Sequence, residues 1–286
     1  MPNHPLPDAP WGLLLAWYFV LIGLSSGITL ITCGQRAWRR EARQPATDLV
    51  GAAIALVLLG IAGLLLIVDL GRPDRFFLML TNFTNLGSPI SVGAKLIALK
   101  GFLLVTDLYL GARARAADGS IRRPGNRMTS LVVGAVTWSL GIVSFALAIY
   151  PAIVLSRTWL APLAATSGAA LVFLLTACVM GAAVHLVLAR EDAAALRVGT
   201  LALLAGYAVT LAMQALSVTG DEGLRTSVVA GSGALALWGS TAVVLGIAAP
   251  AAALTVSRSR SVHLAAAALI LFGSAACRYL FFVLGR

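Results

Sequence analysis

The amino-acid sequence predicts an all-α integral membrane protein with eight transmembrane helices. Of the 286 residues, 59% are hydrophobic and 11% are charged, and the mean hydropathy of +0.93 is too high for a soluble domain of this length. Apolar runs of about twenty residues recur along the chain, and each can cross a hydrocarbon core about 30 Å thick. Continuous runs of this kind exclude a β-barrel, whose strands alternate over about ten residues. The predicted spans are 11–33, 49–68, 88–110, 128–150, 163–189, 197–219, 228–250 and 262–284.

The positions of the arginines predict how these spans cross the membrane. A net charge of +10 would suit a nucleic-acid-binding protein, but the basic residues gather in alternate connections. The connections after the first, third, fifth and seventh spans hold Arg36, Arg39, Arg40, Arg43, Arg113, Arg115, Arg122, Arg123, Arg127, Arg190, Arg197, Arg258 and Arg260. The opposite connections hold only Arg72, Arg75, Arg157 and Arg225. The positive-inside rule therefore places both termini on the non-cytoplasmic side, and no nucleic-acid partner is expected.

The first span contains two small residues four positions apart, Gly23 and Gly27. Residues at this spacing share one face of a helix, and glycine has no side chain to keep a neighbouring backbone away. We therefore expect another helix to approach the first span closely.

The third span is the most polar, because it holds Lys95, Lys100 and Asp107. Ionisable groups inside a membrane are costly and are functional candidates. Lys100 and Asp107 are seven residues apart, which places them on one face of the helix. They could form a proton path from the cytoplasmic side. Alternatively, Asp107 reaches the interface and Lys95 extends outward to water.

The fourth span ends at Tyr150-Pro151, before a short outer link that contains Trp159 and Pro162. Because proline lacks the amide hydrogen that continues a helix, Pro151 is expected to help set the end of this span. The aromatic residues suit the membrane interface, where Tyr and Trp commonly anchor helices.

Polar residues from five spans are expected in the outer third of the membrane. A quinone headgroup needs hydrogen-bond donors for its carbonyls, a titratable group and apolar walls. A purely structural polar network would use the same residue types, and both interpretations fit. The residues are Tyr18, Asp69, Tyr150, Gln214 and Arg278.

The cysteines and histidines do not predict a metal centre. Cys33, Cys178 and Cys277 lack the paired spacing of a metal or iron–sulfur site. His185 and His263 lie near the predicted cytoplasmic ends of their spans, whereas membrane haems usually need histidines facing each other within the span. We expect no metal, haem or cluster in this chain.

Four motifs carry a resemblance to a known family. They are Trp17-Tyr-Phe-Val-Leu-Ile-Gly-Leu-Ser-Ser-Gly27, then Asp69-Leu-Gly-Arg-Pro-Asp-Arg-Phe76 with Ser88-Pro-Ile-Ser-Val-Gly93, then Tyr150-Pro151 with Trp159-Leu-Ala-Pro162, and finally Leu271-Phe-Gly-Ser-Ala-Ala-Cys-Arg-Tyr279. In sequence and order they resemble the motifs of the NrfD family, which includes the polysulfide reductase membrane subunit. The resemblance extends over most of the chain, and residues 1–286 are expected to form one NrfD-like transmembrane domain.

The resemblance implies two four-helix bundles and a menaquinone or ubiquinone bound near the outer face. Tyr150 matches the tyrosine that touches the quinone in polysulfide reductase, while Tyr18 stands where that protein has a histidine. The matching motifs also assign Asp69, Arg72, Arg75 and Arg278 to the quinone site. The alternative, a proton-translocating module of a larger respiratory complex, would use Lys100 and Asp107.

The resemblance further implies the assembly in which this chain works. Family members dock on a four-cluster iron–sulfur protein, which connects to a molybdopterin catalytic subunit or a multihaem cytochrome. The chain would thus be a membrane anchor of a respiratory oxidoreductase in the bacterial cytoplasmic membrane, exchanging electrons between the quinone pool and a periplasmic iron–sulfur subunit. Its own part is either non-catalytic or the oxidation of quinol. A transporter is not favoured, since no pair of spans is interrupted near the midplane.

Overall fold

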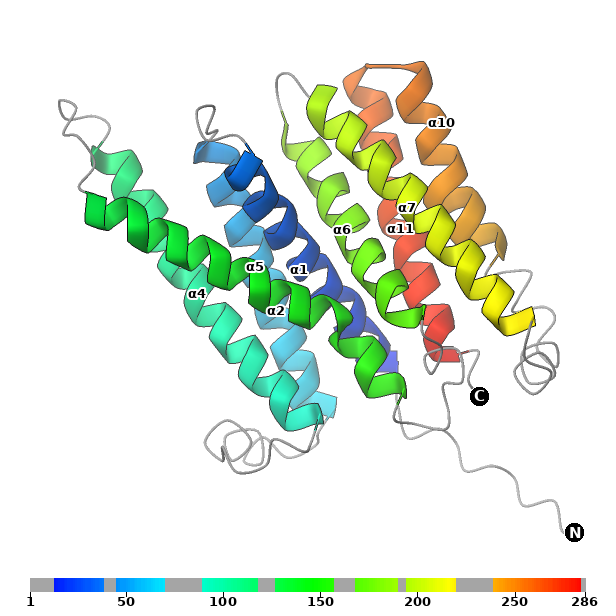
Figure 1. The fold of residues 1–286 in the computed structure, drawn as a ribbon, viewed down its shortest axis with the longest axis horizontal. Helices are drawn as coiled ribbons and strands as arrows, with labels where there is room; N and C mark the ends of the chain where they lie inside the picture. The colour runs from blue at the N-terminus through cyan, green and yellow to red at the C-terminus, as the bar shows by residue number, and fades with distance from the viewer. Residues whose placement is uncertain are drawn as a thin grey trace, which may run out of the picture.

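The computed structural model describes an entirely helical arrangement for residues 13–38, 45–69, 89–117, 127–156, 168–189, 194–219 and 239–283 (Figure 1). The helices are α1 (Leu13–Trp38), α2 (Pro45–Asp69), α4 (Pro89–Ala117), α5 (Arg127–Ser156), α6 (Ala169–Leu188), α7 (Ala194–Thr219), the π-helix η2 (Gly239–Ala248), α10 (Ala249–Val256) and α11 (Arg260–Val283). Because η2 runs directly into α10, these two elements form one continuous rod, 239–256.

Helices α1 and α6 lie at the centre of the molecule. In Figure 1, α2, α4 and α5 lie on one side of this pair, and α7, α10 and α11 lie on the other. Helix α1 packs against α2, α5, α6 and α11, whereas α6 packs against α1, α5, α7 and α11. These two helices are also the most enclosed of the apolar helices. A polar side chain on α1 can therefore meet partners from either half of the molecule.

The described helices make this a multi-pass membrane protein. Six of them are long and apolar enough to cross a membrane, namely α1, α2, α5, α6, α7 and α11. Helix α4 has the length, at 29 residues, but its lysines, aspartate and arginines lower its hydropathy. The described part of the seventh predicted span is short, covering Ser240–Val256. The total of eight spans thus stays a prediction.

Several helix boundaries differ from those expected, and two of the differences involve a proline. Pro151 lies inside α5, which continues to Ser156, so the prediction that this proline sets the helix end was wrong. Proline removes only the hydrogen bond to the carbonyl of Leu147, and a helix in an apolar environment retains its remaining backbone bonds. The rod 239–256 also extends six residues beyond the predicted end at position 250, through an apolar run that has no proline after Pro250.

Glycines set the closest contacts between helices. A Cβ atom on Gly27 would overlap the backbone of α6 at Ala177, and one on Gly181 would overlap Gly27. This confirms the expectation that the small residues of α1 admit a neighbouring helix. The rod and α11 meet in the same manner, because a Cβ atom on Gly273 would overlap Gly246.

Candidate functional site

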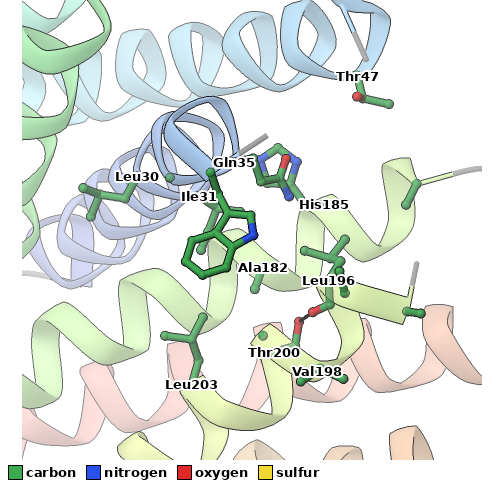
Figure 2. A pocket seen from close by; sticks show the side chains of 16 residues that line it. Leu30, Ile31, Gln35, Thr47, Ala182, His185, Leu196, Val198, Thr200 and Leu203 are labelled. Atoms are coloured by element: carbon green, nitrogen blue, oxygen red, sulfur yellow. Dashed lines mark hydrogen bonds between the residues drawn. The ribbon is translucent and has the colours of Figure 1, made fainter. Parts of the chain in front are cut away.

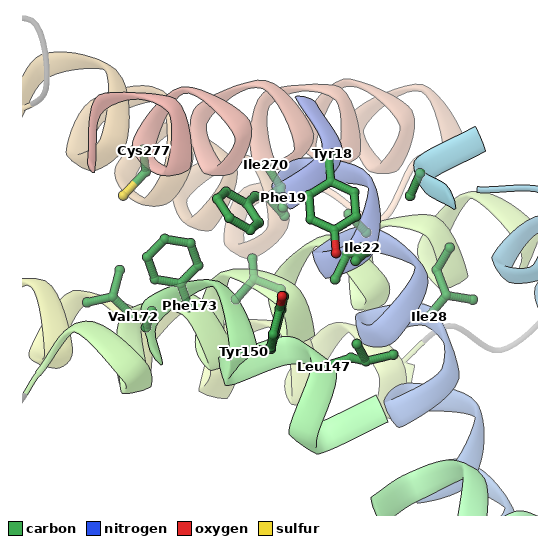
Figure 3. Packing of buried hydrophobic residues seen from close by; sticks show 14 of the residues in the cluster. Tyr18, Phe19, Ile22, Ile28, Leu147, Tyr150, Val172, Phe173, Ile270 and Cys277 are labelled. Carbon is green, nitrogen blue, oxygen red and sulfur yellow. The ribbon is translucent and has the colours of Figure 1, made fainter. Parts of the chain in front are cut away.

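Two tyrosines face one another between α1 and α5. Tyr18 is 1% exposed and Tyr150 is 7% exposed, and their hydroxyl groups point toward each other (Figure 3). The two hydroxyl groups are near enough to interact with each other, but their geometry is not that of an ordinary hydrogen bond, and the Tyr18 hydroxyl has no such bond with any described residue. A buried hydroxyl without such a partner is uncommon and requires an explanation. The side of the molecule that carries this pair is named the Tyr150 end below.

A glycine on α4 makes room for the Tyr150 phenol. A Cβ atom at Gly93 would overlap the hydroxyl oxygen and the adjoining ring carbon of Tyr150. Gly93, the last residue of the Ser88–Gly93 motif, therefore leaves the space that this side chain occupies. Two residues further along α4, Lys95 donates a hydrogen bond of 3.1 Å to the hydroxyl of Ser91.

Arg278 joins α11 to both α1 and α6. Its Nε donates to the hydroxyl of Thr176 at 2.9 Å, Nη1 donates to the carbonyl of Phe19 at 2.9 Å, and Nη2 donates to the carbonyl of Phe173. The guanidinium also lies over the ring of Phe173, 5.1 Å from its centroid. A Cβ atom on Gly23 would overlap the guanidinium, so this glycine gives it space. No described carboxylate forms an ion pair with Arg278.

These contacts hold the part of α1 that carries Tyr18. The carbonyl that Nη1 binds belongs to Phe19, the residue after Tyr18, whose ring packs on the Tyr18 ring at 5.2 Å between centroids. All three guanidinium nitrogens are used in holding α1 and α6. The sequence placed Arg278 in a quinone site; its observed contacts are with α1, which carries Tyr18, and with α6.

Lys100 is buried in the middle of the bundle among hydroxyl groups. Its Nζ donates to the hydroxyls of Ser25 at 3.0 Å and Ser26 at 3.1 Å, and Ser25 in turn donates to the carbonyl of Ala55 at 2.7 Å. The side chain is 0% exposed. None of the described carboxylates lies within ion-pair distance of it. A fully buried lysine without a carboxylate is costly to keep charged.

Asp107 instead belongs to an ion-pair network at the other end of the molecule. Arg36 of α1 binds both carboxylate oxygens of Asp107, at 2.7 and 3.0 Å, and its Nε binds Asp48 of α2 at 3.0 Å. The three side chains are largely buried. Lys100 and Asp107 both point into the bundle, but they have different partners. This network defines the Arg36 end of the molecule.

Arg36 shows what sequence reasoning missed. The sequence indicates only a basic residue in a cytoplasmic connection, yet Arg36 lies in α1 and joins α1 to α2 and α4. Its one available signal was Asp48 twelve residues later, an acid placed in the first turn of the next helix. The roles of Gly93 and of Ser25 and Ser26 required the packing of α4 against its neighbours.

A cavity of about 730 Å³ lies between α1, α6 and α7, on the Arg36 side of the molecule. Figure 2 shows residues from these helices around it, with Leu30 and Gln35 on α1, His185 on α6 and Leu203 on α7. His185 is 3% exposed, and its Nε2 lies 3.1 Å from the Thr32 hydroxyl. No motif predicted this cavity.

Part of the predicted site lies outside the described residues. Asp69 is the last residue of α2, but its side chain is not described. Arg72 and Arg75 belong to the undescribed segment 70–88. Within the described helices, no group of three or more His, Cys, Asp and Glu side chains could hold a metal ion.

Comparison with known proteins relates this chain to a protein family and to a reductase subunit. The family described as Polysulphide reductase, NrfD matches residues 2–286, which is nearly the whole chain. A putative membrane subunit of dimethyl sulfoxide reductase from Halobacterium salinarum is 31% identical over 111 residues. That stretch covers 38% of this chain and only 25% of the relative.

Proposed function

This chain belongs to the NrfD polysulphide reductase family, and on that basis we propose that it is the quinone-binding membrane anchor of an oxidoreductase complex. The similarity to a protein named as a reductase membrane subunit supports this assignment, although the match covers a quarter of that protein. The anchor would exchange electrons between the membrane quinone pool and a periplasmic iron–sulfur subunit.

The observation that carries the proposal is the pair of facing phenols at Tyr18 and Tyr150. A quinone is a two-electron, two-proton carrier whose carbonyl oxygens accept hydrogen bonds. Tyr150 would donate to one carbonyl, and the Tyr18 hydroxyl, which lacks an ordinary protein partner among the described residues, would supply a further donor. Their surroundings are apolar, including the rings of Phe19 and Phe173, as a quinone headgroup requires. The ligand would be menaquinone or ubiquinone.

Residues around this pair would position it. Gly93 would keep the Tyr150 phenol in place, and Arg278 would fix the turn of α1 that carries Tyr18. Asp69, Arg72 and Arg75 belong to the motif that follows α2, and we assign them to the rim of the same site. This assignment follows the family motif, which comes directly before α4, the helix whose Gly93 lies against Tyr150.

The site would be close to the surface that meets the partner subunits. Electrons would pass from the quinone to a cluster of the proposed partner subunit, so the quinone would have to bind within tunnelling distance of that cluster. A quinone at the Tyr150 end, which the arginine distribution places outside the cytoplasm, would suit a periplasmic partner. We propose a four-cluster iron–sulfur subunit, joined to a molybdopterin subunit or a multihaem cytochrome, at the bacterial cytoplasmic membrane.

A second candidate function is favoured by the buried Lys100. Among the described residues its ammonium group donates hydrogen bonds to the hydroxyls of Ser25 and Ser26, and hydroxyls can pass protons. Asp107 and Arg36 lie further along the same bundle. The chain would then be a proton-translocating module, with Lys100 and Asp107 on the path.

Quinone content and proton uptake test the two candidates. The intact complex is purified in lipid nanodiscs, its bound quinone is extracted and identified, and proton uptake is followed with a pH-sensitive dye during quinol turnover. The anchor function predicts a bound quinone and protons released only at the Tyr150 side. Proton uptake from the Arg36 side, coupled to turnover and lost in Lys100→Met, supports the second candidate instead. A complex without quinone and without quinol-dependent turnover rejects both.

A further inference from the structure

We propose that the cavity between α1, α6 and α7 is a second binding site, and that its ligand is a quinol. The site would bind the reduced form, because the histidine nitrogen available to the ligand is a hydrogen-bond acceptor. This inference rests on the proposed function, since it assumes that the chain works in a membrane with a quinol pool. It concerns binding alone and includes no electron transfer.

The cavity is distant from the tyrosine pair. Thr32, which contacts the cavity residue His185, is fourteen residues from Tyr18 on the same helix. At about 1.5 Å per residue this separation is about 21 Å. One headgroup cannot occupy both places. The two sites would lie toward opposite membrane surfaces.

His185 lines the cavity and has a ring nitrogen that no described residue binds. The Thr32 hydroxyl donates its proton to the carbonyl of Ile28 at 2.9 Å. Nε2 of His185 lies 3.1 Å from the Thr32 oxygen and 3.3 Å from the Ile28 carbonyl, and both of these atoms can accept from it. Nε2 therefore carries the hydrogen in the neutral ring, which leaves Nδ1 as an acceptor. No described residue is bonded to Nδ1, and the ring lines the cavity.

An acceptor within an apolar wall selects a ligand that has a donor. Each hydroxyl of a quinol donates one hydrogen bond, whereas the carbonyls of the oxidised quinone donate none. Gln35 also lines the cavity, and its amide can both donate and accept. A ring hydroxyl that donates to Nδ1 could therefore accept from Gln35.

Charge and size favour a quinol over a phospholipid headgroup. No Lys, Arg, Asp or Glu side chain is among the described residues that line the cavity. A phosphate would leave its charge without a cation, because the nearby Arg36 is already paired with Asp48 and Asp107. The volume of about 730 Å³ lies in the usual range for ligand sites, and Leu30, Ile31 and Leu203 provide apolar contacts for a ring and tail.

Photolabelling tests this site. A short-tail azidoquinone, reduced to the quinol, is cross-linked to the intact complex in nanodiscs, and the labelled peptides are identified by mass spectrometry. We expect label on α1, α6 and α7 around the cavity. His185→Phe should lower it about tenfold by removing the acceptor. Gly199→Phe should do the same by filling the cavity, and it should fold normally because a Cβ atom there meets nothing within 4 Å.

His263→Phe is the matched control, since this histidine is on α11 and does not line the cavity; its labelling should equal the wild type. Label at the cavity that survives both cavity variants would overturn the inference. So would label confined to the Tyr150 end, which would leave the proposed function intact. Label confined to the cavity would instead reject the tyrosine site. A photoreactive phospholipid that labels the cavity when the quinol does not would also overturn it.

Discussion

The hydroxyl oxygen of Tyr150 occupies space that a Cβ atom on Gly93 would fill. Only glycine at position 93 is compatible with the present orientation of the phenol. The glycine of one motif and the tyrosine of another, on different helices, therefore form one structural unit. The first prediction follows from this contact.

Gly93→Ala should move the Tyr150 side chain and lower quinol-dependent turnover by about tenfold or more, equivalent to about 1.4 kcal/mol. The measurement is quinol oxidation by the assembled complex, normalised to the amount of complex. Gly101→Ala is the matched control on the same helix, because its Cβ atom would meet only a Leu59 methyl at an ordinary 3.9 Å. Equal turnover in both variants would contradict a role for the Gly93 recess.

Tyr150→Phe should lower quinol-dependent turnover by about tenfold, since it retains the ring and removes the donor. Electron transfer from an artificial dye to the partner subunits should be unchanged, which separates quinone chemistry from assembly. Tyr18→Phe should have an equal or smaller effect. Wild-type turnover in Tyr150→Phe would make this tyrosine an interface anchor and move the search toward Tyr18.

Arg278→Gln should lower stability more than it lowers specific activity. The substitution leaves the carbonyls of Phe19 and Phe173 short of donors inside the bundle, at about 1–3 kcal/mol for each buried group. Thermal unfolding in detergent and the yield of assembled complex measure this effect. Arg260→Gln, on the exposed start of the same helix, should unfold like the wild type. Normal stability with lost turnover would place Arg278 in direct contact with the quinone.

Arg72→Ala should lower assembly of the complex more than turnover per assembled complex. An arginine at a boundary of low dielectric needs an acidic partner, and Asp69 and Asp74 are nearest in sequence. Removing one member of a buried pair costs about 3–5 kcal/mol. Blue-native gels give the yield and quinol assays give the turnover. Normal yield with lost turnover would instead make Arg72 a residue of the site itself.

Cysteines introduced into the connections should label according to the arginine distribution. A cysteine at position 120 should be protected from a membrane-impermeant maleimide in spheroplasts, and one at position 80 should react. Native Cys33, Cys178 and Cys277 are replaced first to give a clean background. Reaction at position 120 alone would invert the topology and place the tyrosines on the cytoplasmic side.

Helix positions and the approach at Gly27 followed from local patterns in the sequence. Apolar runs of membrane length locate helices because every backbone group in lipid must be paired. The partners of Lys100 and Asp107 did not follow, since spacing along α4 specifies a face but not the helix opposite to it. The serines that bind Lys100 and the arginine that binds Asp107 are all on α1, more than seventy positions away. The predicted helix end at Pro151 was wrong for a related reason. One missing hydrogen bond does not end a helix that is packed between its neighbours.

The hydrogen bond from Arg278 to the Phe19 carbonyl connects residues 259 positions apart. During synthesis, α1 therefore enters the membrane long before the arginine that completes its contacts has been translated. A nascent chain that stops before position 278 contains α1 and α6 without the guanidinium that joins them. Formation of this bond is thus a late step in biogenesis. An Arg278 variant would remain incompletely packed after synthesis and is expected to be degraded by membrane proteases.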